Sequence, residues 1–351
     1  MNCKKGQGAI IHPFLNTITD TIHSLPVAIF YVTEGCNLGC ITCSYRDKLP
    51  DELSVEEIET LAGQLGALGL RRIVYSGGEP LLRRDFIEIC KIFQKRPVKQ
   101  SLLTNGVLLG KRIDEIAPFL DEIIISLDGA DAATHDAIRG VRSFDIIIEN
   151  IRLTRQRYPG ISISLRTVIQ KKNFHQLRDI VELGIALSLQ RVSFLSVDVL
   201  SEAFGREHGI ATAGESELLL SQGEIEEFRD SINKLAETHS KYFASGFISE
   251  SVPKLTHLAD YFEAALAGKN FPHVNCNAPM VSTVITSTGN VLPCFFLPPL
   301  GNIRKQSLQD ILNGKEAKQT RRNVRNYAYE RCHTCVCSLH VSPLAVLKAE
   351  W

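Results

Sequence analysis

The sequence predicts an α/β protein, with a partial (β/α)6 barrel followed by a small cysteine-rich α+β domain. Apolar strand-like segments alternate with helix-like segments over residues 26–197, and each strand-like segment ends at a polar or glycine-containing motif. From Cys276 onward the pattern changes to short strands, turns and clustered cysteines. Alternating strands and helices predict a parallel sheet. Ligands of such sheets bind at the carboxyl ends of the strands, where these motifs fall.

The expected barrel strands are short runs that are apolar on both faces, as a buried parallel sheet requires. The first leads directly into three closely spaced cysteines, and the second ends at Gly77-Gly78. The third ends at Thr104-Asn105-Gly106, and the fourth at Asp128-Gly129. We expect strands at Val27–Val32, Arg72–Ser76, around Ser101–Leu103, Glu122–Leu127, Ile161–Ile169 and Arg191–Ser196.

Helices are expected between these strands and in the segment that follows them. Ser54-Val-Glu-Glu57 forms a capping box at the start of one helix, and apolar residues then recur at helical spacing. Residues 201–223 are rich in Gly, Ser, Ala and Glu and indicate a long loop. Further helices are expected near Phe174–Ala186, Glu224–Phe243, Lys254–Ala267, Ser307–Asn313 and Lys315–Val324.

Composition restricts the classes of function. Hydrophobic residues make up 44% of the 351 residues, which is enough for a substantial core. Lys plus Arg and Asp plus Glu number 39 each, so no net charge attracts nucleic acid or an anionic membrane. No apolar run has the length of a signal peptide or a membrane span. We therefore expect a soluble, cytoplasmic protein.

The ten cysteines are unevenly distributed, which favours metal binding over a disulfide framework. Three lie within eight residues, at Cys36, Cys40 and Cys43, and five lie between Cys276 and Cys337. Disulfide frameworks suit small secreted chains. In a reducing compartment, clustered thiols are typical soft-metal ligands.

The first cluster has the spacing Cys36-x3-Cys40-x2-Cys43. A [4Fe–4S] cluster normally takes four thiolates. Three close cysteines without an obvious fourth leave one iron open, which S-adenosylmethionine (SAM) can bind through its amino and carboxylate groups. The alternative at this point is a structural zinc loop that borrows a distant ligand.

Together with the motifs after the later strands, this spacing resembles the radical SAM superfamily. An aromatic residue, Tyr45, lies two residues past the last cysteine, and Gly77-Gly78-Glu79-Pro80 follows the second strand as in that family. The resemblance implies that Gly77–Pro80 contacts the methionyl end of SAM and that Glu79 accepts from its ammonium group. It implies a (β/α)6 radical SAM barrel that generates a 5′-deoxyadenosyl radical.

Further residues extend the resemblance. Ser126 and Arg139 are expected to reach the SAM carboxylate, and Asp128 to lie near the ribose. Asn105, in Thr104-Asn105-Gly106, lies on the same rim, but this motif is less specific for a SAM site. Helix capping is the favoured role for Thr134 and Asp136, and a structural role for His135. No catalytic side chain is assigned.

The second cysteine group resembles the SPASM and twitch domains, which bind auxiliary Fe–S clusters. Gly289-x4-Cys294 has their form, and five cysteines suit the shorter twitch type with one [4Fe–4S] cluster. The expected ligands are Cys276, Cys294, Cys332 and Cys335, with Cys337 as the alternate for Cys335. A four-cysteine zinc ribbon is the alternative, because Cys332-x2-Cys335 also suits zinc.

Three functions follow. The first is a radical SAM oxidoreductase that acts on an alcohol or methyl carbon of a small metabolite; tetrapyrroles such as a bacteriochlorophyllide are among the candidates. It would use SAM, two clusters and an external electron donor such as flavodoxin or ferredoxin. The second is a peptide-modifying maturase, which the short N-terminal extension weakly disfavours. The third is a non-catalytic zinc protein.

The expected domain boundaries follow the changes in pattern. They are an N-terminal extension at 1–25, the barrel at 26–197, a linker or substrate cover containing His208 at 198–275, the auxiliary domain at 276–340, and a C-terminal tail at 341–351.

Overall fold

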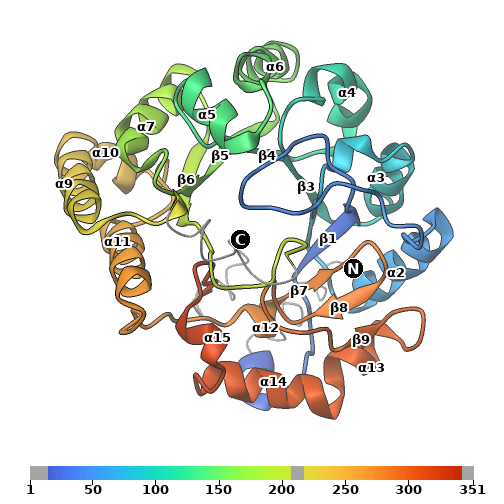
Figure 1. Cartoon of the computed structure of the whole chain (residues 1–351). Coiled ribbons are helices and arrows are strands. Elements are labelled where there is room, and N and C mark those ends of the chain that lie inside the picture. Colours follow the sequence, from blue (N-terminus) through green and yellow to red (C-terminus); the bar gives the residue numbers. More distant parts are fainter. Residues whose placement is uncertain (1–14, 207–216, 342–351) are drawn as a thin grey trace, which may run out of the picture.

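Six parallel strands form a curved sheet that β7 to β9 extend at the β1 edge (Figure 1). The structure, a computed structural model, describes residues 15–206 and 217–341. The strand order is β6-β5-β4-β3-β2-β1-β7-β8-β9. The strands are β1 (Val27–Thr33), β2 (Arg72–Gly77), β3 (Lys99–Thr104), β4 (Glu122–Ser126), β5 (Ser162–Ile169), β6 (Arg191–Ser196), β7 (Ser282–Ile285), β8 (Asn290–Leu292) and β9 (Gly301–Asn302).

Helices surround the strands on the outside of the barrel (Figure 1). Those of the barrel are α2 (Val55–Ala67), η1 (Pro80–Leu82), α3 (Phe86–Gln94), α4 (Leu109–Ile116), η2 (Ala117–Phe119), α5 (Ala132–Arg139), α6 (Phe144–Arg157), η3 (Phe174–Gln176) and α7 (Leu177–Ala186). Those that follow are α9 (Gln222–Thr238), α10 (Ser240–Ala244), α11 (Val252–Ala267), α12 (Ala278–Val281), α13 (Leu308–Asn313), α14 (Lys315–Arg325) and α15 (Glu330–His333).

Local sequence signals explain where several elements begin. The capping box expected at Ser54 is formed: its side chain accepts from the Glu57 amide, and Glu57 accepts from the Ser54 amide. The helix expected over 224–243 is divided into α9 and α10 at His239, whose backbone departs from helical geometry. All six expected barrel strands are present within two residues of their expected bounds.

The two faces of the strands are buried to different extents. In β4, Ile123 and Ile125 are fully buried, whereas Ile124 and Ser126 are half-buried. The fully buried face packs on the surrounding helices, and the other lines the barrel. The expectation that the strands are apolar on both faces is therefore wrong for β4 and β5, whose inner faces carry Ser126 and Arg166.

The C-terminal segment adds directly to the barrel sheet. Strand β7 pairs in parallel with β1, from Val27 opposite Ser282 to Phe30 opposite Ile285. Helices α11, α14 and α15 lie between the β6 side and β7–β9 (Figure 1). The second cysteine group is thus held at the open side of the barrel.

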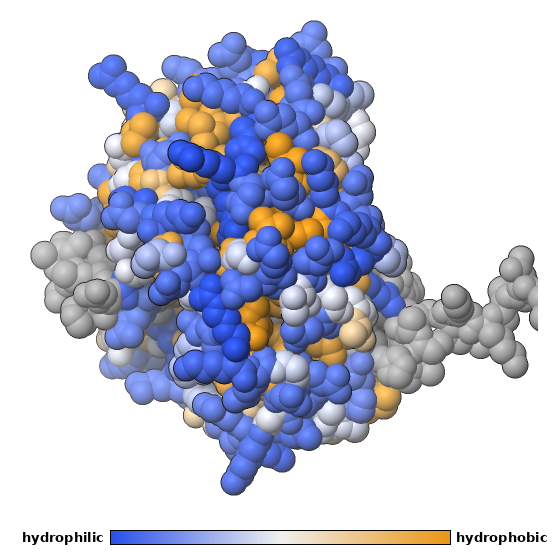
Figure 2. Space-filling model, turned by 90° about the vertical axis from the view of Figure 1, so that its right-hand side faces the viewer, coloured by the Kyte–Doolittle hydropathy of each residue, from blue (hydrophilic) through white to orange (hydrophobic). Residues whose placement is uncertain are grey.

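The surface is mainly hydrophilic on the face shown in Figure 2, with small separate apolar patches. Within residues 15–206 and 217–341, no helix combines the length and the apolar character needed to cross a bilayer.

Candidate functional site

The first cysteine loop leaves the carboxyl end of β1 and is held by backbone hydrogen bonds from three directions. The Gly39 amide donates to the Arg139 carbonyl at the end of α5 (3.1 Å). The Ser44 amide donates to the Phe204 carbonyl, in the loop after β6 (3.0 Å). The Glu79 amide, after β2, donates to the Gly35 carbonyl (2.8 Å). The loop conformation therefore depends on several barrel strands, not on its own sequence alone.

Gly78 is a glycine because the cysteine loop packs directly on its backbone. A Cβ atom at this position would lie 2.3 Å from the Gly35 carbonyl oxygen and 2.6 Å from that of Glu34. The Gly78 amide also donates to the Thr33 carbonyl (2.9 Å). The sequence expectation was that the glycines of this motif allow backbone contact with SAM; in the structure, Gly78 allows contact with the loop that carries Cys36.

Replacing Gly78 with alanine should displace the cysteine loop, because the clash is with backbone atoms that cannot rotate away. We expect a loss of stability of about 3 kcal/mol and weakened iron retention. Chemical denaturation and iron analysis would measure both. Gly223→Ala is the matched control, since a Cβ there meets no atom within 4 Å and alanine favours the helix. Equal behaviour of the two variants would contradict the packing argument.

The Glu79 carboxylate is fully buried and binds protein donors. It accepts from the Thr104 hydroxyl (2.8 Å), the Asn105 amide (2.8 Å) and the Leu81 amide (3.0 Å). Burial raises the pKa of Glu79 to about 7, and these three donors oppose that rise. These contacts join the ends of β2 and β3, and acceptance from the SAM ammonium group stays a prediction. Pro80 is buried at the start of η1.

Asn105 extends this network to the cysteine loop. Its side-chain amide donates to the Asn37 side-chain oxygen (2.8 Å), and its own oxygen accepts from the Val107 amide. Asn37 follows Cys36 directly. Asn105 thereby links the end of β3 to the first cysteine, a contact whose partner the sequence did not indicate.

Arg139 connects Asp128 to the first cysteine group. Its Nη2 atom lies 2.8 Å from Asp128 Oδ2, and its Nη1 atom donates to Cys40 Sγ at 3.8 Å. Within the described residues, its buried Nε atom has no hydrogen-bond partner. Asp128 also accepts from the Val168 amide on β5 (2.8 Å). Asp128, expected near the ribose, is thus the ion-pair partner of the arginine expected to bind the SAM carboxylate.

His135, Thr134 and Asp136 have structural contacts. Burial lowers the pKa of His135 to about 3, and its Nδ1 atom accepts from the Asp128 amide (3.2 Å). Asp131 caps α5 by accepting from the Thr134 amide, while Asp136 accepts from the Ser143 and Phe144 amides at the start of α6. The contacts of His135 and Asp136 agree with the structural and capping roles that we favoured, whereas Thr134 lies within α5 and the cap is Asp131.

The thiols of the first group lie close enough to interact electrostatically. Burial raises the pKa of Cys36, and the nearby Cys40 and Cys43 add to the rise. Burial also raises the pKa of Cys43, against the lowering effect of Arg46 and Arg139. Binding to a metal would remove the cost of forming these thiolates. The Tyr45 ring lies 6.0 Å from that of Tyr31 on β1, edge to face.

The second cysteine group is built on β7, β8 and α15. Cys276 precedes α12, where its sulfur accepts from the Ala278 amide (3.5 Å). Cys294 follows β8, and Gly289 of the G-x4-C motif forms the turn between β7 and β8 with a φ of 84°. Cys332 lies in α15, and Cys335 and Cys337 follow it. The motif glycine therefore positions Cys294 by reversing the chain.

Electrostatic contacts separate Cys335 from Cys337. Burial raises the pKa of Cys335, and Cys337, Cys276 and Cys294 add to that rise. Burial raises the pKa of Cys337 too; Arg166 on β5 opposes that rise and Cys276 adds to it. Both thiols are thus affected by Cys276, whereas Cys294 affects Cys335 and Arg166 affects Cys337. Cys335 as the fourth ligand, with Cys337 as its alternate, remains a proposal.

Aromatic rings and an ion-pair network join the two cysteine groups. Phe295, next to Cys294, is stacked with Tyr31 at 6.3 Å, and Tyr31 in turn contacts Tyr45. Asp198, after β6, is buried and pairs with Arg206 (2.6 Å) and with Arg331 (2.7 Å), the neighbour of Cys332. No sequence motif indicated Asp198, Arg206 or Arg331, because their partners are up to 133 residues apart.

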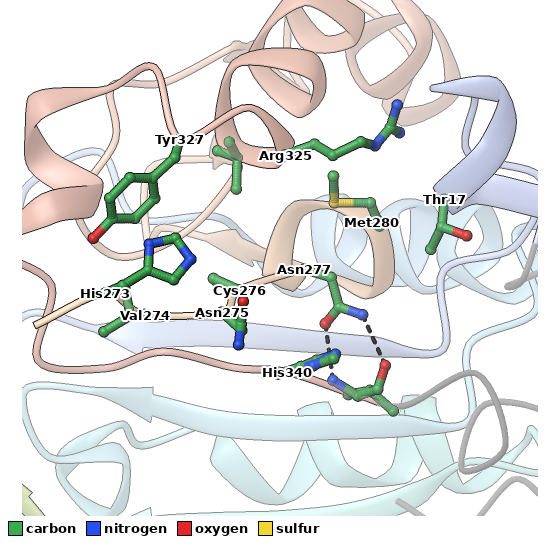
Figure 3. A pocket seen from close by; sticks show the side chains of 12 residues that line it. Thr17, His273, Val274, Asn275, Cys276, Asn277, Met280, Arg325, Tyr327 and His340 are labelled. Carbon is green, nitrogen blue, oxygen red and sulfur yellow. Dashed lines mark hydrogen bonds between the residues drawn. The ribbon is translucent and has the colours of Figure 1, made fainter. Parts of the chain in front are cut away.

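A cavity of about 340 Å³ lies beside Cys276 (Figure 3). His273 and Tyr327 line it with ring centroids 4.3 Å apart, and Asn277 forms hydrogen bonds with the backbone of Val341. Cys276 of the second cysteine group lines the cavity, and no cysteine of the first group does. His208 and the rest of residues 207–216 of the expected substrate loop lie outside the described residues.

The donor sets fit Fe–S clusters. All the described cysteines are free thiols, and two groups of them combine soft donors with buried surroundings and nearby arginines. Among the described residues, no three Cys, His, Asp or Glu side chains are gathered as ligands of a single metal ion. The thiolates of a cubane bind different irons and so lie farther apart than those around one ion.

Comparison with known proteins decides the family. The model of the radical SAM superfamily matches residues 30–184, and that of an iron–sulfur cluster-binding domain, SPASM, matches residues 276–336. The chain belongs to the radical SAM superfamily. It is a radical SAM enzyme with a C-terminal SPASM domain, and [4Fe–4S] clusters and SAM are its cofactors. The matches disfavour a non-catalytic zinc protein.

Curated relatives of this radical SAM enzyme differ in what they make. An AdoMet-dependent heme synthase of Methanosarcina barkeri is 27% identical over 296 residues, covering 81% of each chain. A PqqA peptide cyclase of Rhizobium meliloti is 26% identical over 315 residues, covering 87% of this chain and 77% of the relative. These names include both a tetrapyrrole product and a peptide substrate.

Solved structures share the fold. SuiB of Streptococcus suis superposes with a TM-score of 0.65 at 16% identity, covering 95% of this chain and 77% of SuiB. The enzyme anSMEcpe with bound AdoMet gives a TM-score of 0.62 at 18% identity, covering 88% and 87%. At this identity the likeness concerns the fold alone.

Proposed function

We propose that this radical SAM enzyme is an oxidoreductase that removes hydrogen from a carbon of a small metabolite, with a tetrapyrrole as the favoured substrate. When bound, the first cluster would supply the electron that cleaves SAM, and the auxiliary cluster would accept an electron from the substrate. Cys36, Cys40 and Cys43 would hold the first, and Cys276, Cys294, Cys332 and Cys335 the second. An external donor such as flavodoxin or ferredoxin would supply the reducing electron.

The arrangement of the two cysteine groups is the observation that carries this proposal. Tyr31 contacts Tyr45 of the first loop and Phe295 beside Cys294, so the two groups lie on either side of one aromatic contact. A substrate between them would lie within reach of both. The side chains here exclude water, since Tyr31 is 6% exposed, and they would thereby protect a reactive intermediate.

The choice of a tetrapyrrole rests on the heme synthases among the relatives, one of which aligns over 81% of both chains. A peptide substrate is the second candidate, because a PqqA peptide cyclase aligns over 87% of this chain. The two candidates predict different substrate dependence of SAM cleavage.

The test uses the full chain, reconstituted anaerobically with iron and sulfide, and measures 5′-deoxyadenosine. We expect Fe-coproporphyrin III, chosen as a porphyrin probe, to increase 5′-deoxyadenosine formation and to lose hydrogen. A ribosomal peptide encoded beside the gene is the comparison. Stimulation by that peptide and not by the porphyrin would contradict the proposal and support the maturase alternative.

A further inference from the structure

Arg166 lies on the inner face of the barrel at the level where β4 ends. It is opposite Ser126 on β4 and Ser193 on β6 in the parallel registers. Its neighbours in β5, Leu165 and Thr167, are fully buried on the outer face, whereas Arg166 is half-buried. The guanidinium group therefore faces the interior of the barrel near its mouth.

Nearby acidic groups are already bound to other partners. Asp128 pairs with Arg139, and Asp198 pairs with Arg206 and Arg331. Glu250 accepts from the hydroxyl of Ser193, the residue opposite Arg166, and from the Phe194 amide. Within residues 15–206 and 217–341, Arg166 forms no side-chain hydrogen bond or ion pair.

A half-buried guanidinium without an anion is unfavourable, because burial removes hydration that nothing replaces. Its planar donors match a carboxylate in two-point contact. The ligand that suits this position is thus an anion with a planar pair of oxygen atoms.

The position also distinguishes the substrate from SAM. Arg139 contacts Cys40 of the first group, whereas Arg166 is paired in register with Ser193 on β6, the strand that leads to Asp198 and its ion-pair partner Arg331 beside Cys332. The two arginines therefore lie on different sides of the barrel mouth. We propose that Arg166 binds a carboxylate of the substrate, an inference that rests on the proposed function.

Chemical labelling tests the carboxylate site without knowledge of the substrate. Phenylglyoxal modifies accessible arginines, and mass spectrometry of the peptide that contains Arg166 measures its rate. We expect glutarate to slow this rate about threefold and its diamide, glutaramide, to leave it unchanged. Equal rates with both compounds would overturn the proposal. Protection by SAM at equal ionic strength would also overturn it, because Arg166 would then belong to the cofactor site.

Turnover provides the second test. With Fe-coproporphyrin III as the probe, Arg166→Gln should lower kcat/KM at least about tenfold, and Arg166→Lys should recover part of the loss. SAM affinity and 5′-deoxyadenosine formation without substrate should stay unchanged. Arg191→Gln, at the exposed amino end of β6, is the matched control.

The two tests separate failure of the inference from failure of the proposed function. If the wild-type protein converts the porphyrin and Arg166→Gln converts it equally well, the Arg166 assignment is wrong. If the wild-type protein does not convert the porphyrin, the proposed function fails, and the glutarate experiment still decides whether Arg166 binds a carboxylate.

Discussion

Replacing Cys36, Cys40 and Cys43 together with alanine should abolish reductive formation of 5′-deoxyadenosine. The three thiols lie on one loop, and the Gly78, Arg139 and Phe204 contacts fix its backbone independently of the sulfur atoms. The loop should therefore fold in the variant while lacking every ligand. We expect iron to fall from about eight to about four per chain, since one of two cubanes is lost.

Anaerobic reconstitution, iron and sulfide analysis, and chromatography of 5′-deoxyadenosine would measure this result. Cys90→Ala is the matched control, because Cys90 is a buried cysteine of α3 within the hydrophobic core, apart from both groups. It should keep its iron and its SAM cleavage, with a modest loss of stability. Persistent 5′-deoxyadenosine formation in the triple variant would show that the SAM site has been misassigned.

Much of the barrel could be predicted because its signals are local. The Ser54 capping box and the apolar runs of β1 to β6 depend on neighbouring residues, and all of them are present in the structure. The place of β7 was not predictable in this way. The four residues Ser282–Ile285 can form a strand but do not indicate its partner, which is β1, some 255 residues earlier by the pairing of Val27 with Ser282.

The site was predicted less completely than the fold, because motifs indicate residues and not their partners. Glu79 was expected to accept from the SAM ammonium group, and no motif indicated that its oxygens accept from Thr104, Asn105 and Leu81. Asp128 was expected near the ribose, and no motif indicated its ion pair with Arg139. Both side chains support the residues that carry the cysteine loop. Only the tertiary contacts reveal these protein partners.

Arg166 is the opposite case, a residue that the structure selects and the sequence did not. Its sequence context, a charged residue in an apolar strand, gave no reason to select it. Its importance comes from register, which places it opposite Ser126, and from the prior pairing of Asp128 and Asp198. Neither observation can be made before the strands are aligned.

Replacing Cys276 and Cys294 with alanine should separate SAM cleavage from product formation. Without these two ligands the auxiliary cluster should be lost, while the first cysteine group keeps all its thiols. We expect 5′-deoxyadenosine formation without substrate to stay within about twofold of the wild type, and product formation to fall at least about a hundredfold. Spectroscopy of the remaining cluster and chromatography of both products would measure the separation.

The expected survival of SAM cleavage depends on contacts that do not involve the cluster. Pairing of β7 with β1, the Asp198–Arg331 ion pair and the Glu57–Arg304 ion pair all hold the C-terminal segment on the barrel. Loss of two thiols leaves each of these in place. The aromatic contact between Tyr31 and Phe295 should remain as well, so the first loop keeps its surroundings.

Single variants of the last two cysteines provide the control for this prediction. Cys335→Ser should lose iron and product as the double variant does, whereas Cys337→Ser should retain iron, because the proposed ligand set uses Cys335, which both Cys276 and Cys294 affect, and not Cys337, which Arg166 affects. Loss of both SAM cleavage and product in the double variant would contradict the prediction. It would mean that the second cluster, and not the β1–β7 pairing, holds the barrel mouth in shape.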